Sequence, residues 1–215
     1  MDGDPDANLA TVLGIPVGKT IGDLREETLK EIKSLPPGMA KDVYIETVLQ
    51  EVIVETPRVD LITMGRGEGP SCYCYLNNLL RKFTEHLLAS YDWIVMDNEA
   101  GLEHLSRRIA PRIDSLIVVV NESPLSIDCA RRIENIVDTL QVRVGKKYVV
   151  ANAVHDERLA VVEEKIASLN MNYLGHLPHD DTLEDLLLRG ESICKLNGNP
   201  CVLRINEMMN KLGVA

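Results

Sequence analysis

Short apolar segments alternate with longer amphipathic segments along the chain, and this alternation limits the possible folds more than any other feature of the sequence. Apolar segments rich in Val, Ile and Leu are typical of parallel strands that are buried on both faces. The stretches between them place apolar residues three and four positions apart, as helices that cover a sheet do. We therefore expect the α/β class, with a mostly parallel sheet flanked by helices in a single domain over residues 1–215.

The same periodicity gives the approximate bounds of the elements. Strands are predicted at 59–65, 92–98, 114–121, 146–152 and 172–178. Helices are predicted at 20–34, 42–53, 75–90, 125–140, 156–169 and 200–212, and the stretch 8–14 also has helical spacing. Proline and glycine mark breaks at 35–39 and 67–71.

Charge and hydropathy exclude several classes of function. The chain has 23 Lys and Arg against 33 Asp and Glu, a formal charge of −10, and its basic residues form no run, so we expect no nucleic-acid partner. The apolar runs are far shorter than the roughly 20 residues of a membrane span, and an acidic stretch follows Met1, so we expect no membrane association and a cytoplasmic location. The 5 cysteines are scattered and odd in number, which does not suggest a disulfide framework.

The stretch GIPVGKT, residues 14–20, resembles part of a phosphate-binding loop but departs from the pattern G-x-x-x-x-G-K-[ST]. Only three residues stand between its glycines, and one of them, Pro16, lacks an N–H group for a phosphate. We expect instead that Thr20 caps the helix that follows, with Asp23 three residues on.

Carboxylates occur at two places suited to magnesium. Asp97 ends a predicted strand, a position from which it could hold a water of hydrated Mg²⁺, although an aspartate there could equally cap the following loop. Asp2, Asp4 and Asp6 form a second cluster, one member of which could orient water or magnesium. The alternative for this cluster is a solvated acidic terminus.

Cys72 and Cys74 form a candidate soft-metal site. In extended backbone, residues two apart point to the same side, so both thiolates could bind one ion and supply half of a tetrahedral site. A two-fold homodimer would supply the other half. The alternative is a pair of small buried hydrophobic residues. The remaining cysteines are interpreted as core or incidental.

Histidines and aspartates also gather after the last predicted strands. Loops after strands collect such residues for helix capping, and no spacing here matches a known metal motif, so we favour capping over metal binding. The residues concerned are His155, Asp156, His176, His179, Asp180 and Asp181.

Several segments, in this order along the chain, resemble the CooC type of nickel-insertion accessory ATPase of carbon monoxide dehydrogenase. They are DGDPDANLA, GKTIGDLREE, GRGEGPSCYCYLNNLLR, YDWIVMDNEAGLEHLSRR and NESPLSIDCARRI. This type is part of the MinD/ParA and nitrogenase iron protein group of dimeric P-loop ATPases. The resemblance covers essentially the whole chain. It implies a MinD-like P-loop NTPase fold in a homodimer that uses ATP and Mg²⁺ to deliver nickel to carbon monoxide dehydrogenase or acetyl-CoA synthase.

The resemblance also implies roles for individual residues. Asp4 matches the aspartate of the first switch, which helps to orient the attacking water, and Asp97 matches the Walker B-like magnesium aspartate. Cys72 and Cys74 match the metal-binding pair, which would hold Ni²⁺ or Zn²⁺.

Two further matches concern the nucleotide base. Asn152 resembles the asparagine that reads the adenine edge in this group. The segment LPHD, which contains Pro178, His179 and Asp180, resembles the loop that lines the base.

The sequence departs from this type at its beginning. Members carry a G-K-G-G-x-G-K-[ST] loop between a first strand and a first helix, ahead of the segment that opens this chain. We expect a chain truncated at its N-terminus, in which the absence of the central first strand leaves unpaired backbone groups. Whether the chain is itself an ATPase is left open. The alternative function is a P-loop-less metal-binding and dimerising subunit without ATPase activity.

Overall fold

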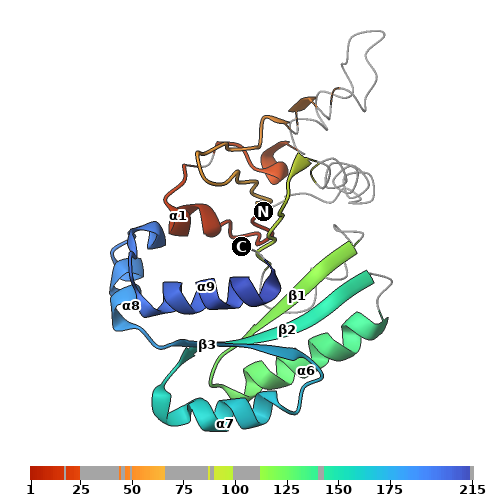
Figure 1. Cartoon of the computed structure of the whole chain (residues 1–215). Helices are drawn as coiled ribbons and strands as arrows, with labels where there is room; N and C mark the ends of the chain where they lie inside the picture. Colours follow the sequence, from red (N-terminus) through yellow and green to blue (C-terminus); the bar gives the residue numbers. More distant parts are fainter. Residues whose placement is uncertain are drawn as a thin grey trace. The chain divides into compact units, whose positions relative to one another are not determined.

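Residues 1–16, 18–24, 50–65, 90–98, 112–139 and 143–213, with residues 44, 47, 48 and 87, are described by the structure, a computed structural model. Cys72 and Cys74 lie outside the described residues. The chain divides into two compact units, which contain the described residues up to 98 and from 112 onward, respectively. Figure 1 shows both, and each is considered by itself. No helix in the described parts of the chain is long and apolar enough to cross a membrane.

The first unit is organised around the extended residues 1–3. Asp2 forms parallel bridges with both Thr63 and Asp97, so this segment lies between two others. The Asp2 N–H donates to the Ile62 carbonyl at 2.8 Å, and the Gly3 N–H donates to the Asp97 carbonyl at 2.7 Å. The predicted strands 59–65 and 92–98 are therefore present as short bridged segments. An antiparallel bridge between Val54 and Leu61 was not predicted.

Helical segments of the first unit pack against these bridged segments. Helix α1 (Leu9–Leu13) ends at Gly14, which adopts a left-handed conformation with φ 71°. Residues 21–24 are also helical, at the start of the helix predicted over 20–34. Among the described residues of this unit, the buried core contains Ile21, Leu24, Val48, Val52, Ile62 and Leu87.

The second unit is a three-stranded parallel sheet in the order β1-β2-β3, with helices between its strands. Its elements in chain order are β1 (Arg112–Val120), α6 (Pro124–Thr139), β2 (Arg143–Val154), α7 (Asp156–Ile166), β3 (Asn172–Pro178), α8 (Asp181–Leu188), the 3-10 helix η2 (Ile193–Lys195) and α9 (Pro200–Leu212). The predicted bounds of β3 and α9 are confirmed, and those of the other predicted elements of this unit are close. Helix α8 was not predicted.

Helices cover both faces of the sheet around β2. Val149 and Ala151 are fully buried on the face that packs against α6 and α7. Tyr148 and Val150 point to the opposite face, where Met208 of α9 covers them. Figure 1 shows α9 on one side of the sheet and α6 and α7 on the other. The α/β class expected from the sequence is confirmed in this unit.

A close backbone approach helps to fix the pairing of β1 with β2. A Cβ atom at Gly145 would lie 2.6 Å from the carbonyl oxygen of Asp114, so no side chain fits there without movement of the backbone. Glycine at this position allows the two strands to pair as far as Arg112 and Arg143.

Asp180 joins the beginnings of α8 and α9. Its Oδ1 accepts a hydrogen bond from the Leu183 N–H at 3.0 Å and so caps α8. Its Oδ2 accepts from Asn199 Nδ2 at 2.6 Å, and Asn199 itself caps α9 by accepting from the Cys201 N–H at 2.8 Å. The Asp180 carboxylate therefore caps α8 and holds the residue that caps α9. The hydrogen bond from the Asn199 amide is the largest cause of the lowered pKa of Asp180.

Substitution of Asp180→Ala should lower the free energy of unfolding by about 1–2 kcal/mol, because it removes a helix cap and the bond to Asn199. Urea unfolding followed by circular dichroism measures this loss. Asp185→Ala is the matched control, since Asp185 is an exposed residue of α8 whose nearest ion-pair partner, Arg189, is 3.9 Å away. Equal losses in the two variants would contradict the capping role of Asp180.

Candidate functional site

Polar side chains gather in each unit at the carboxyl ends of paired parallel segments, which is where open α/β sheets bind ligands. The first group, the carboxylate cluster, consists of Asp2, Asp4 and Asp97. The second group lies at the carboxyl edge of the β1-β2-β3 sheet. We call it the edge cluster, and it consists of Glu122, His155, Arg158, His179, Asp181 and Glu184.

Asp2 provides the framework of the carboxylate cluster. It is fully buried, and its two carboxylate oxygens accept hydrogen bonds from the backbone N–H groups of Asp4 and Leu9, each at 3.1 Å. These bonds shape the turn that carries Asp4 and fix the start of α1. Thr63, which is bridged to Asp2, has a buried hydroxyl without a hydrogen-bond partner among the described residues.

Asp97 and Asp4 are the accessible carboxylates of this cluster. Asp97 is exposed, yet partial desolvation raises its pKa; the charges of Asp2 and Asp4 raise it further, and the Met1 ammonium lowers it. Asp4 uses its Oδ1 to accept from the Asp6 N–H at 2.8 Å. Asp4 is thus close enough to Asp97 for its charge to raise the pKa of Asp97, and the Met1 ammonium places one positive charge beside the same carboxylate.

Within the stretch GIPVGKT, Gly14 ends α1 and Thr20 precedes the helix that starts at residue 21, as predicted. Thr20 and Asp23 cap each other: the Thr20 N–H donates to Asp23 Oδ2 at 2.9 Å, and the Asp23 N–H donates to Thr20 Oγ1 at 3.1 Å. Lys19 lies 3.9 Å from a carboxylate oxygen of Glu51. The contacts of Thr20 and Asp23 are those of a helix N-terminus.

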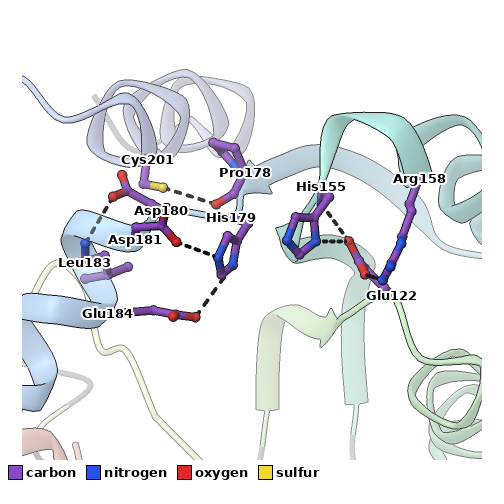
Figure 2. Close-up of polar contacts among 10 residues, drawn as sticks. All are labelled: Glu122, His155, Arg158, Pro178, His179, Asp180, Asp181, Leu183, Glu184 and Cys201. Carbon is purple, nitrogen blue, oxygen red and sulfur yellow. Dashed lines mark hydrogen bonds and ion pairs between the residues drawn. The ribbon is translucent and has the colours of Figure 1, made fainter.

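Glu122 connects the carboxyl ends of β1 and β2. Its Oε1 accepts from the His155 N–H at 2.6 Å and lies 2.7 Å from His155 Nδ1, while its Oε2 accepts from the Arg158 guanidinium (Figure 2). The bonds to His155, followed by those to Arg158, lower the pKa of Glu122 to about 2. Sequence reasoning did not single out Glu122 or Arg158, because their role depends on which strands are neighbours.

The rings of His155 and His179 stack, with centroids 4.4 Å apart and an interplanar angle of 22°. The His179 N–H also donates to the Val154 carbonyl at 3.1 Å, which fixes the loop after β3 against the end of β2. On its other side the His179 ring faces α8, with Nε2 3.0 Å from Asp181 Oδ1 and Nδ1 3.6 Å from Glu184 Oε1 (Figure 2).

Capping explains Asp180 but not the two stacked histidines. Asp180 accepts from the Leu183 N–H, as the capping interpretation expects. His155 precedes α7 without a side-chain cap bond, and its ring is bound by Glu122 instead. His176 lies within β3.

Asn152 and Pro178, the other residues matched to a base-binding loop, lie near the paired ends of β2 and β3. Asn152 is exposed in a part of β2 where the register with β3 shifts, and the neighbouring Ala153 has a positive φ of 53°. Pro178 ends β3, and its carbonyl lies 3.6 Å from Cys201 Sγ. A left-handed alanine is strained by roughly 1–2 kcal/mol, so the irregularity is held in place by the surrounding structure.

Comparison with known proteins identifies relatives of the whole chain. No family model matches. The "Uncharacterized ATP-binding protein MJ0685" of Methanocaldococcus jannaschii is 38% identical over 215 residues, which are 99% of this chain and 85% of that protein. The chain belongs to the family of MJ0685. Another relative of this chain is the carbon monoxide dehydrogenase accessory protein CooC of Rhodospirillum rubrum. It is 26% identical over 66% of this chain and 59% of that protein.

Comparison with solved structures shows the fold of this chain. The cell division protein MinD of Aquifex aeolicus matches with a TM-score of 0.68 and 21% identity, over 100% of this chain and 84% of that one. A ParA family ATPase from Chlorobium tepidum matches with a TM-score of 0.65 and 16% identity, over 97% and 84%. The fold is the MinD/ParA-like P-loop NTPase fold, as expected from the resemblance.

The bonds of Glu122 predict a pH-dependent contribution to stability. Because its pKa is lowered from 4.5 to about 2 in the folded chain, the carboxylate stabilises the fold above about pH 4.5, and this contribution is lost as the pH falls toward 2. The difference in unfolding free energy between wild type and Glu122→Gln should therefore be largest above about pH 4.5 and should shrink toward pH 2.

Denaturant unfolding at a series of pH values measures this difference. Glu164→Gln is the matched control, because Glu164 is an exposed carboxylate of α7. A difference between wild type and Glu122→Gln that stays constant over the whole series would show that the Glu122 charge does not stabilise the edge cluster.

Proposed function

We propose that the chain is a nickel-insertion factor of the CooC type that binds ATP with Mg²⁺ and acts as a homodimer on carbon monoxide dehydrogenase or acetyl-CoA synthase. The observation that carries the proposal is the carboxylate cluster, in which Asp4 and Asp97 interact at the carboxyl ends of paired parallel segments. Two relatives support it, since MJ0685 is named for ATP binding and CooC for its accessory role to carbon monoxide dehydrogenase.

The residues of the carboxylate cluster fit a magnesium ion. Mg²⁺ takes oxygen ligands, keeps several waters, and is usually held by one or two carboxylates together with substrate phosphates. Desolvation and then the charges of Asp2 and Asp4 raise the pKa of Asp97, whereas the Met1 ammonium lowers it, and a cation beside Asp97 would further offset the repulsion among the three carboxylates. Bound Mg²⁺ would supply charge that neutralises phosphate oxygens. Asp97 would hold it through a water molecule, and Asp4 would orient the attacking water.

We assign the base of the nucleotide to the end of the β2-β3 pair. Asn152 would read the adenine edge from its exposed position, and Pro178 with the backbone of His179 would line the ring. Asp180 would contribute by fixing the loop, because both of its carboxylate oxygens already accept hydrogen bonds from Leu183 and Asn199.

Cys72 and Cys74 would hold the metal that is delivered. Two thiolates from each protomer make a tetrahedral site across a two-fold axis, which suits Ni²⁺ or Zn²⁺ in a soft environment. The site would then exist only in the dimer, so the state of the nucleotide could control metal affinity through the association of the protomers.

The alternative, a metal-binding subunit without ATPase activity, has less support. MJ0685, which is named for ATP binding, is 38% identical to this chain over 99% of its length. Absence of any ATP binding by the wild-type protein would reverse this preference.

Asp97→Asn should weaken the binding of Mg²⁺ to the nucleotide complex. Loss of an outer-shell carboxylate typically lowers metal affinity about 10–100-fold. Calorimetric titration of Mg²⁺ into protein saturated with a non-hydrolysable ATP analogue measures this affinity. Asp92→Asn, which removes an exposed carboxylate from the same segment, should leave it unchanged. Equal Mg²⁺ affinities of wild type and Asp97→Asn would remove Asp97 from the proposed site.

Replacement of both Cys72 and Cys74 by Ser should abolish binding of about one nickel ion per dimer. Equilibrium dialysis with Ni²⁺, followed by elemental analysis of untagged protein, measures the stoichiometry. Cys129→Ser, which changes a half-buried cysteine of α6, should retain the nickel. Equal nickel contents in the wild type and the double variant would overturn the assignment of the thiolate pair.

A further inference from the structure

His179, Asp181 and Glu184 bring one nitrogen and two carboxylates to a single point of the edge cluster. One ligand atom from each residue lies within 4.8 Å of those of the other two. The separation of 3.0 Å between His179 Nε2 and Asp181 Oδ1 is comparable with the spacing of neighbouring ligands around one metal ion.

One metal ion can bind only one nitrogen of the His179 ring. Nε2 lies 3.0 Å from Asp181 Oδ1, whereas Glu184 Oε1 lies 3.6 Å from the other nitrogen, Nδ1. An ion would therefore lie beside Nε2 and Asp181, and the exposed Glu184 side chain would turn to reach it.

The three side chains are positioned by structure that does not depend on an ion. Asp181 and Glu184 are three residues apart in the first turn of α8, so they lie on the same face of the helix. The His179 ring is oriented by its stack on His155, whose own ring is held by Glu122. Such outer contacts fix ring orientation in known metal sites.

Exposure and donor type indicate which ion would bind. The His179 side chain is 26% exposed, whereas those of Asp181 and Glu184 are 93% and 62% exposed, so one side of the point is open to water. Three protein ligands with an open position are typical of exchangeable zinc sites. Imidazole favours Zn²⁺ and its first-row neighbours over Mg²⁺ or Ca²⁺, and no thiolate takes part.

We propose that His179, Asp181 and Glu184 form a binding site for a divalent first-row transition metal ion, with Zn²⁺ as the best fit. The ion completes its coordination with water. This site lies in the second unit and uses nitrogen and oxygen ligands, so it is distinct from the carboxylate cluster and from the thiolate pair at Cys72 and Cys74. Its ligand His179 belongs to the loop that is proposed to line the nucleotide base with its backbone, whereas the metal site uses the His179 side chain.

The test is calorimetric titration with Zn²⁺ in a background in which Cys72 and Cys74 are both serine, so that the thiolate pair does not contribute. The background protein should bind one Zn²⁺ per chain. His179→Ala and Glu184→Gln should each weaken this binding by at least about tenfold, the lower limit typical of damage to the surroundings of a metal. Glu184→Gln changes an exposed side chain, so it keeps the test valid even if His179→Ala unfolds.

Two matched controls should retain Zn²⁺ binding. His176→Ala removes an imidazole from β3, and Asp185→Asn removes a carboxylate from α8 that faces Arg189. Failure of the background protein to bind Zn²⁺ would overturn the proposal. Equal affinities in Glu184→Gln and Asp185→Asn would overturn it as well.

Discussion

Strand β2 is hydrogen-bonded to a parallel neighbour on each side and is buried on both faces, and the arrangement of the second unit depends on it. Its alternating residues supply both cores, with Val149 and Ala151 toward α6 and α7 and Tyr148 and Val150 toward α9. Because all three strands run in the same direction, the residues that follow them meet at one edge. Glu122, His155 and His179 come together for this reason, although they are far apart in sequence.

The periodicity of the sequence predicted the elements of the second unit well, because each strand and helix there has a strong apolar pattern of its own. Helix α8 was not predicted because it spans only 8 residues. A segment this short is not long enough for its leucines to show a clear helical period. The capping of the helix after GIPVGKT by Thr20 and Asp23 was predictable, since both partners lie within one turn of each other.

Contacts between strands were beyond the reach of sequence reasoning. Asp4 and Asp97 could be placed in one site because each follows an extended segment and because the resemblance to a known family joined them. The bond between Glu122 and His155 requires β1 and β2 to be neighbours in a particular register, and the register shift around Asn152 leaves no mark in the pattern of apolar residues. The stack of His155 on His179 depends on both of these features.

The bond between Asp180 and Asn199 has a mechanical consequence for the edge of the sheet. Helices α8 and α9 are tied together at their first turns, and α9 is anchored to β3 by the bond from Lys211 to the Leu174 carbonyl. Separation of the two helix starts would break only this bond, because Asp180 caps α8 through Oδ1 and Asn199 caps α9 through its own side-chain oxygen. The link between the helices is thus separate from their caps, and the two first turns could move apart at this point without unwinding of either helix.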